Sequence, residues 1–238
     1  MIFTVFALAK QAMLRRLEKD TSICILVISP LTSIAADQIA QMESFGFNAV
    51  ELTELTLTDV IHSPPNFIYS SAERATERAF LEALKDDCSL LHQRTASIVV
   101  DESHTVETWT GKRKNKCKKA NMNKAFRSAF GKLSLLRSMC KKDCPLLALT
   151  GTGDKSTQDT ICNELLLKEP TKLFVSPNRP NLRFSVHKVK KDDMLAQLNW
   201  LISLIEEYGI NTPKTIIFCD TMYTIASVCQ LFDDAIGV

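Results

Sequence analysis

Short apolar runs alternate with longer amphipathic segments along this chain, and the alternation restricts the fold more than any other feature of the sequence. The runs at residues 22–30, 96–103 and 144–153 end in proline, in acidic residues and in glycine, respectively. Continuous apolar runs of this kind are typical of strands buried on both faces of a parallel sheet. Amphipathic segments such as residues 32–46 and 155–167 lie between the runs. We therefore predict an α/β domain, a parallel sheet flanked by helices.

The overall charge excludes a chain that binds nucleic acid through its net charge. The 238 residues carry a formal net charge of only +2, so such affinity would have to come from local basic patches. The eight cysteines include no C-x-x-C pair, which favours a reducing intracellular location, nuclear or cytoplasmic, and no zinc site. Residues 1–20 have the pattern of an amphipathic helix rather than a signal peptide. No run reaches the ~20 apolar residues that span a bilayer, so we expect no membrane partner.

Polar or small residues follow four of the expected strands. These stretches are SPLTS at residues 29–33, SSAER at 70–74, DESH at 101–104 and TGTG at 150–153. In an open parallel sheet the carboxyl ends of the strands share one edge, and ligands bind there. We therefore expect the four stretches to form one functional edge.

Asp101 and Glu102 are the principal candidates for chemistry at that edge. An acid at the end of a buried strand can hold Mg²⁺ through water, and a neighbouring Glu can orient or deprotonate an attacking water. His104 could relay between a nucleotide and nucleic acid. The alternatives are a solvated strand end or helix N-cap for the two acids, and a polar loop residue for His104.

Hydroxyl side chains form two further candidate groups. Ser29 and Thr32 stand where a helix begins, and their hydroxyls could reach phosphates there or simply cap the helix. Thr150 and Thr152 alternate with glycine after a buried strand. They could form a flexible coupling loop beside the acids, or an ordinary turn.

A basic block follows the acids, with no Asp or Glu between Gly111 and Lys124. Aromatic residues flank it, Trp109 before and Phe126 after. Cations that meet phosphates and rings that stack on bases suit a nucleic-acid strand. The alternative is a solvated surface loop. The candidate cations are Lys112, Arg113, Lys114, Lys116, Lys118, Lys119, Lys124 and Arg127.

The character of the sequence changes near residue 176. Residues 176–190 contain two prolines and mixed charge, as in a linker. Beyond them an amphipathic helix ends at Gly209, a buried strand is expected at residues 214–221, and another helix follows. These features predict the start of a second α/β unit at residues 191–238. So short a segment cannot bury a core of its own, and we expect a truncated unit.

Seven stretches of the sequence, in order, resemble the motifs of superfamily 2 helicases, specifically the RecQ-like group. They are VISPLTSIAADQ (27–38, motif Ia), IYSSAERA (68–75), VVDESH (99–104, DEAH-type motif II), ETW with AFRSAFGKL (107–109 and 125–133, the aromatic-rich loop), ALTGTG (148–153, motif III), NRPNLRFSV (178–186) and TIIFCDT (215–221, motif IV). Seven stretches in this order favour the family over an unrelated α/β domain.

The resemblance implies two RecA-like lobes, with lobe 1 at residues 1–175, a linker at 176–190 and the start of lobe 2 at 191–238. It implies 3′-to-5′ DNA unwinding in repair or recombination, with ATP and Mg²⁺ as cofactors. The DNA partner would be single-stranded, or duplex with a 3′ tail.

The resemblance also implies residue roles. Asp101 would hold Mg²⁺ through water, Glu102 would activate water, and His104 would act with Thr150 and Thr152 to couple nucleotide to DNA. Nucleic acid would be bound by Ser29, Pro30, Thr32, Trp109, Lys112, Arg113, Lys114, Phe126 and Arg127.

Several departures from the family pattern qualify these roles. Ser103 stands where Ala is common, Gly151 and Gly153 replace Ala, and the basic block looks inserted in the aromatic-rich loop. More importantly, no G-x-x-x-x-G-K-[ST] phosphate-binding loop occurs in these residues. We therefore expect a helicase fragment that alone neither binds ATP tightly nor hydrolyses it. The alternative is a non-catalytic remnant that binds nucleic acid or a partner.

Overall fold

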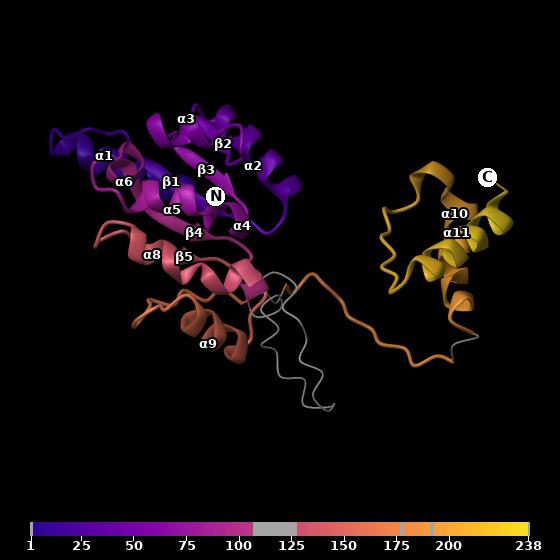
Figure 1. Cartoon of the computed structure of the whole chain (residues 1–238). Coiled ribbons are helices and arrows are strands. Elements are labelled where there is room, and N and C mark those ends of the chain that lie inside the picture. Colours follow the sequence, from indigo (N-terminus) through magenta and orange to yellow (C-terminus); the bar gives the residue numbers. More distant parts are fainter. Residues whose placement is uncertain (1, 107–127, 177–178, 191–192, 238) are drawn as a thin grey trace. The chain divides into compact units, whose positions relative to one another are not determined.

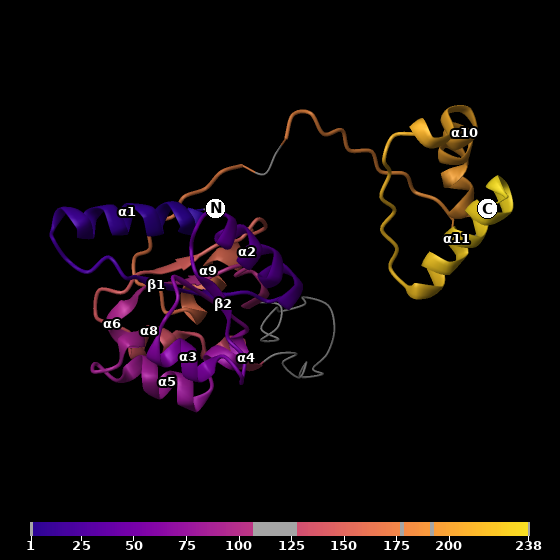
Figure 2. The same ribbon diagram turned by 90° about the horizontal axis from the view of Figure 1, so that it is seen from above.

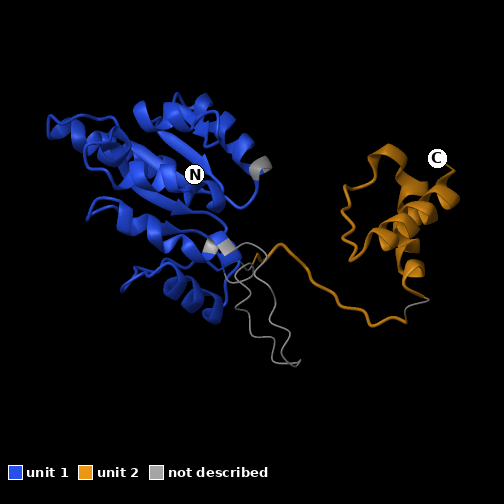
Figure 3. Ribbon diagram, in the orientation of Figure 1, with its two compact units in different colours: residues 1–177 blue, residues 178–238 orange. Residues whose placement is uncertain are grey.

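The computed structural model of this chain describes residues 2–106, 128–176, 179–190 and 193–237 (Figure 1). The chain divides into two compact units, Met1–Pro177 and Asn178–Val238 (Figure 3). Every helix in the described ranges is too short or too polar to cross a lipid bilayer.

Unit 1 is built on a parallel sheet of five strands. The strands are β1 (Cys24–Ile28), β2 (Ala49–Glu51), β3 (Phe67–Ser70), β4 (Thr95–Val100) and β5 (Leu146–Ala148). Their order across the sheet is β2-β3-β1-β4-β5, and all the pairings are parallel. Buried apolar side chains on both faces of β1 explain why it stands at the centre of the sheet. The predicted parallel α/β architecture is confirmed.

Helices cover both faces of this sheet (Figure 2). On one face, α1 (Ile2–Arg16) and α2 (Thr32–Ser44) bury Phe3, Ala7 and Met42 against alternate strand residues such as Val27 and Val99.

Apolar side chains from five helices meet the other face of the sheet in a second core cluster. These helices are α3 (Leu57–His62), α5 (Arg78–Lys85), α6 (Leu90–Arg94), α8 (Ser134–Met139) and α9 (Lys155–Glu164). The short α4 (Ala72–Ala75) and the 3₁₀ helix η1 (Ser128–Lys132) also contribute side chains to this cluster. The alternation of strand side chains between the two clusters follows from the period of two in a strand.

Side-chain caps and glycine fix several helix ends. Ser71, Ser89 and Asp154 each accept a hydrogen bond from a backbone N–H in the first turn of the helix that follows, which satisfies a donor that the helix leaves free. Gly46 has φ +79° just after α2, a conformation that costs glycine little. These ends set the points where the chain turns back to the sheet.

Unit 2 contains η3 (Leu195–Leu198), α10 (Asn199–Tyr208), η4 (Gly209–Asn211) and α11 (Met222–Ile236). The buried strand expected at residues 214–221 is wrong, because this segment is not a strand and Ile216 and Phe218 are 78% and 91% exposed. A strand needs a hydrogen-bonded neighbour, and the described residues of unit 2 contain no strand with which this segment could pair. The assignment of this unit to a second helicase lobe stays a prediction.

Candidate functional site

The backbone holds the ends of three neighbouring strands together at the carboxyl edge of the sheet. The N–H of Asp101 donates to the carbonyl of Ile28 at 2.9 Å, and that of Leu149 donates to Val100 at 2.9 Å. One step further, the N–H of Ser103 donates to the carbonyl of Leu149 at 2.7 Å. The segments after β1, β4 and β5 are therefore fixed against one another rather than free to separate.

Asp101 is half-buried, and both of its carboxylate oxygens are hydrogen-bonded. Oδ1 accepts the N–H of Glu102 at 3.0 Å, and Oδ2 accepts the side-chain amide Nε2 of Gln38 at 3.3 Å. Gln38 lies on α2, and Asp101 directly follows β4. The carboxylate is thus oriented from two elements, as expected for a group that binds a ligand in one direction.

Two buried polar atoms near Asp101 find no hydrogen-bond partner among the described residues. They are the carbonyl Oε1 of Gln38 and the hydroxyl of Tyr69 on β3. Burial raises the pKa of Tyr69 above its ordinary value, and the negative charge of Asp101 raises it further. This second contribution places the Tyr69 hydroxyl within the field of the carboxylate. Unpaired buried groups of this kind are costly unless water or an ion completes them.

These groups fit a hydrated magnesium ion. Mg²⁺ prefers oxygen ligands, usually keeps several of its waters and is held by one or two carboxylates. Asp101 supplies the carboxylate, and Gln38 Oε1 supplies an acceptor for a proton of a metal-bound water. The residues present are therefore compatible with a hydrated Mg²⁺ ion.

Glu102 adopts a left-handed backbone conformation with φ +45°. Its carbonyl accepts hydrogen bonds from the backbone N–H of Thr105 at 2.9 Å and from the Thr105 hydroxyl at 2.8 Å. Residues other than Gly and Asn are unfavourable in the left-handed region of backbone conformation, so the turn holds Glu102 in a strained conformation. Such strain is concentrated at functional sites.

His104 connects the acidic turn to the loop that follows β5. Its Nδ1 lies 3.2 Å from Oε2 of Glu102 and 3.0 Å from Oγ1 of Thr150. The Thr150 hydroxyl donates to the carbonyl of Thr152 at 2.6 Å. Because a hydroxyl has one proton to donate, His104 Nδ1–H is then the donor to Thr150.

Thr152 is also tied to this chain of hydrogen bonds, since its N–H donates to Oγ1 of Thr150 at 3.2 Å. A continuous series of polar contacts therefore runs from the carboxylate of Glu102 through the imidazole of His104 and the hydroxyl of Thr150 to the backbone of Thr152. A change at the acid has a direct route to the loop at residues 150–153.

The candidate residues after β1 occupy the same edge, but Ser29 uses its hydroxyl within the chain. Ser29 is buried, and its Oγ donates to the carbonyl of Leu31 at 3.3 Å. Pro30 follows it, and Thr32 is the first residue of α2. The N-cap of α2 is Leu31, which makes no side-chain cap. The simple capping alternative is therefore wrong for Ser29, while the side chain of Thr32 lies outside the described part.

The remaining predicted nucleic-acid contacts lie outside the described residues. They are Trp109, Lys112, Arg113, Lys114, Phe126 and Arg127.

Sequence reasoning missed Gln38, Tyr69 and Ser103, whose buried Oγ has no hydrogen-bond partner among the described residues. A signal for Gln38 exists in the sequence. It lies on α2 between Ala35 and Met42, both of which face the core, at the helical spacing of three and four residues. A polar residue on the apolar face of a helix indicates that its side chain has a specific hydrogen-bond partner, which here is Asp101.

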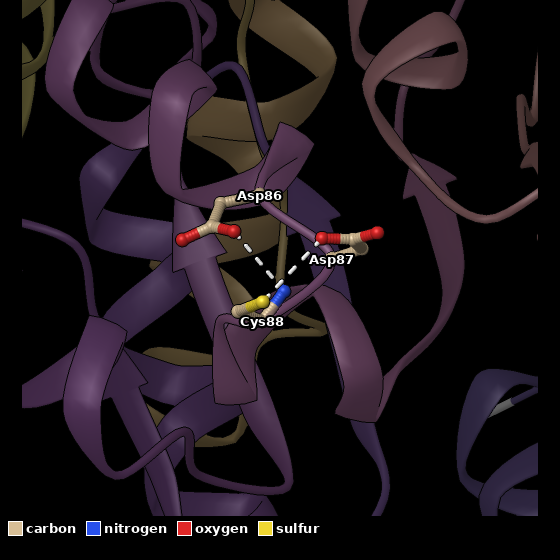
Figure 4. Close-up of side chains that lie close together, drawn as sticks. All are labelled: Asp86, Asp87 and Cys88. Atoms are coloured by element: carbon tan, nitrogen blue, oxygen red, sulfur yellow. Dashed lines mark hydrogen bonds between the residues drawn. The ribbon is translucent and has the colours of Figure 1, made fainter.

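One group of three potential metal ligands occurs in the described part of the chain, Asp86, Asp87 and Cys88 (Figure 4). All three are exposed. The N–H of Cys88 donates to Asp86 Oδ1 at 3.0 Å, and its thiol donates to Asp87 Oδ1 at 3.6 Å. These bonds close an ordinary turn after α5. We assign no site to it.

Comparison with solved structures defines the class of fold. No protein-family model matches the sequence. The structure is similar to that of the DUF1998 helicase MrfA, solved with DNA and AMPPNP, with a TM-score of 0.55 and 12% identity over 92% of this chain and 31% of that one. Unit 1 therefore has the RecA-like α/β fold found in a helicase, which confirms the predicted fold class.

Curated relatives narrow the resemblance. The chain is 29% identical to the ATP-dependent helicase wrn-1 of Caenorhabditis elegans over 85% of its length, and 28% identical to RecQ of Pasteurella multocida over 86%. It is 27% identical to RecQ of Haemophilus influenzae over 70% of its length. The predicted resemblance to RecQ-like helicases is confirmed. The chain spans 18%, 29% and 25% of these three relatives, respectively.

Proposed function

We propose that this chain supplies part of a RecQ-like, ATP-dependent 3′-to-5′ DNA helicase, namely the edge that holds a hydrated Mg²⁺ and relays its state to the DNA-facing loops. The observation that carries the proposal is the position of His104 Nδ1, 3.2 Å from Glu102 and 3.0 Å from Thr150. The similarity to RecQ-type relatives supports the substrate class.

Each side chain at the edge has a distinct role in this proposal. When bound, Mg²⁺ would neutralise phosphate charge. Asp101 would hold the ion through its waters, and Gln38 orients the carboxylate through its hydrogen bond to Oδ2. Glu102 is placed to accept a proton from a water at the edge, because its carboxylate is 41% exposed and no Arg or Lys of the described residues is paired with it. His104 then senses the charge of Glu102 and transmits it to Thr150.

The residues at the carboxyl edge of the sheet do not form a cradle for the phosphates of ATP. A phosphate cradle needs successive backbone N–H groups in a Gly-rich loop and a Lys, and the sequence contains no such motif. We infer that this chain alone neither binds ATP tightly nor hydrolyses it. The function proposed for its residues is therefore metal binding and coupling.

The partner in this proposal is DNA, either single-stranded or duplex with a 3′ tail. The segment after β1, with Pro30 and Thr32, lies beside the acidic turn because the backbone N–H of Asp101 donates a hydrogen bond to the carbonyl of Ile28.

A second candidate function is a remnant that binds nucleic acid without catalysis. It is favoured by the basic block at residues 111–124 together with the lack of a phosphate-binding loop.

A pair of measurements on the purified chain separates these functions. We expect no DNA-stimulated ATP hydrolysis above that of Glu102→Gln; turnover that this substitution abolishes would contradict the inferred inactivity. A salt titration of single-stranded DNA binding then tests the remnant. A steep slope that falls when Lys112, Arg113 and Lys114 are replaced by Gln supports it, and no binding at all excludes it.

A further inference from the structure

A cavity opens at the amino-terminal edge of the sheet, opposite the acidic site. Its volume is about 510 Å³, and its lining includes the residues that precede or begin β1, β4 and β5 together with Lys10 and Leu14 of α1. In a parallel sheet this edge is separated from the carboxyl edge by the full length of the strands. The cavity is therefore independent of the site proposed above.

Basic side chains outnumber acidic ones in the lining of this cavity. Two carboxylates, Asp20 and Asp143, face five basic side chains. Within the described part of the chain, none of the five forms an ion pair with a carboxylate. They are Lys10, Lys19, Arg94, Lys141 and Lys142.

One of the two carboxylates, that of Asp20, is hydrogen-bonded within its own loop. Oδ1 of Asp20 accepts the N–H of Ser22 at 2.9 Å. Hydrogen bonding from Ser22 is the main reason that the pKa of Asp20 is lowered, and the charge of Arg94 contributes least. Asp20 therefore closes a local turn and keeps its negative charge, so that Asp20 and Asp143 offset only part of the charge of the five basic side chains.

Two ammonium groups converge on the same space. The Nζ of Lys141 donates a hydrogen bond to the carbonyl of Gln93, which also lines the cavity. Partial loss of hydration is the main reason that the pKa of Lys141 is lowered; Cys144 opposes this shift, and the positive charge of Lys10 adds to it. An anion between Lys10 and Lys141 would relieve this repulsion.

The walls between the cations are apolar or small. Leu14, Ile23 and Ala96 line the cavity, and Cys144 lies in it beside Lys141. A volume of about 510 Å³ is within the range of small-molecule sites, and clustered Lys and Arg are the side chains that recognise phosphate.

We propose that this amino-edge cavity binds a small molecule that carries two or more phosphate groups, with Lys10 and Lys141 as its principal ligands. The apolar walls accommodate the organic part of a phosphate ester, while the cations at the mouth meet the phosphates. Free polyphosphate and the backbone of a nucleic acid share this chemistry. The size of the cavity favours the free ligand.

Calorimetric titration of the purified chain with pyrophosphate, in EDTA and at low salt, tests the proposal. We expect saturable binding that weakens at least about tenfold in Lys10→Gln/Lys141→Gln. The matched control is Lys85→Gln/Lys168→Gln, which removes the same charge from two exposed positions outside the cavity, and it should bind as the parent chain does. Circular dichroism establishes that both double variants are folded.

Further arms identify the source of the phosphate and the place of binding. An oligothymidylate that fails to displace pyrophosphate supports the free ligand, whereas full displacement overturns that choice in favour of a nucleic-acid backbone. Asp101→Asn should leave the affinity unchanged, because its carboxylate lies at the other edge. No saturable binding, equal weakening in both double variants, or loss of binding in Asp101→Asn overturns the proposal.

Discussion

The Nδ1 atom of His104 lies 3.0 Å from Oγ1 of Thr150, 46 positions further along the chain. The same nitrogen lies 3.2 Å from Oε2 of Glu102, so one imidazole joins the acidic turn after β4 to the loop after β5. The loop has no other side-chain hydrogen bond to the acidic turn within the described residues. The contact of His104 with Thr150 is therefore the physical basis of the proposed coupling.

Removal of the Thr150 hydroxyl should loosen the loop without disturbing the sheet. We expect Thr150→Val to lower the free energy of unfolding by about 0.5–1.5 kcal/mol and to speed amide hydrogen exchange at Thr152, whose N–H bonds to the lost oxygen. Thr150→Ser keeps the oxygen and should retain slow exchange. Equal exchange at Thr152 in the Val and Ser variants would show that the hydroxyl does not hold the loop.

Because Glu102 has a left-handed backbone conformation, we expect glycine to be more stable than alanine at this position. At φ +45° a Cβ is unfavourable by roughly 1–2 kcal/mol, so Glu102→Gly should be more stable than Glu102→Ala by about 1 kcal/mol. Chemical denaturation of both variants measures the difference. Glu82, on the exposed side of α5, provides the control, since Gly there should be less stable than Ala. The same order at both positions would contradict the strained turn.

Tyr69 should make stability fall at alkaline pH. Burial and the charge of Asp101 raise its folded pKa above the ordinary value of 10.0, so the unfolded state loses the phenolic proton first. The contribution of Tyr69 to stability should therefore be constant below about pH 10 and decline above it, by up to about 1.4 kcal/mol per pH unit. Tyr69→Phe should reduce this decline.

The other two tyrosines serve as matched controls for that titration. Tyr208 and Tyr223 are 49% and 83% exposed, and their replacement by Phe should leave the alkaline slope unchanged. Absorbance at 295 nm should show one tyrosine that ionises only when the chain unfolds. Three tyrosines that ionise together in the folded chain would exclude a buried Tyr69 beside Asp101.

Much of the candidate site could be predicted because parallel strands align their carboxyl ends. Asp101 and Thr150 each follow an apolar run, and that alone places them at one edge of the sheet. Their neighbours Glu102 and His104 come with them along the chain. The roles of these residues stay predictions.

Other parts of the site depend on relationships that the sequence does not record. Tyr69 lies near Asp101 only because β3 and β4 flank the same strand, β1, and this order differs from the order along the chain. Gln38 reaches Asp101 because of the rotation of α2 about its axis. The strand expected at residues 214–221 failed for a related reason, since an apolar β-branched run predicts a strand without supplying its neighbour.

Binding of Mn²⁺, a paramagnetic substitute for Mg²⁺, tests the central claim most directly. Water-proton relaxation of the purified chain should report saturable Mn²⁺ binding that Asp101→Asn abolishes and Gln38→Leu weakens. Asp86→Asn/Asp87→Asn removes a second pair of adjacent carboxylates, both exposed, and should leave the binding unchanged. Binding that survives Asp101→Asn, or that disappears only with Asp86 and Asp87, would contradict a metal site at the carboxyl edge of the sheet.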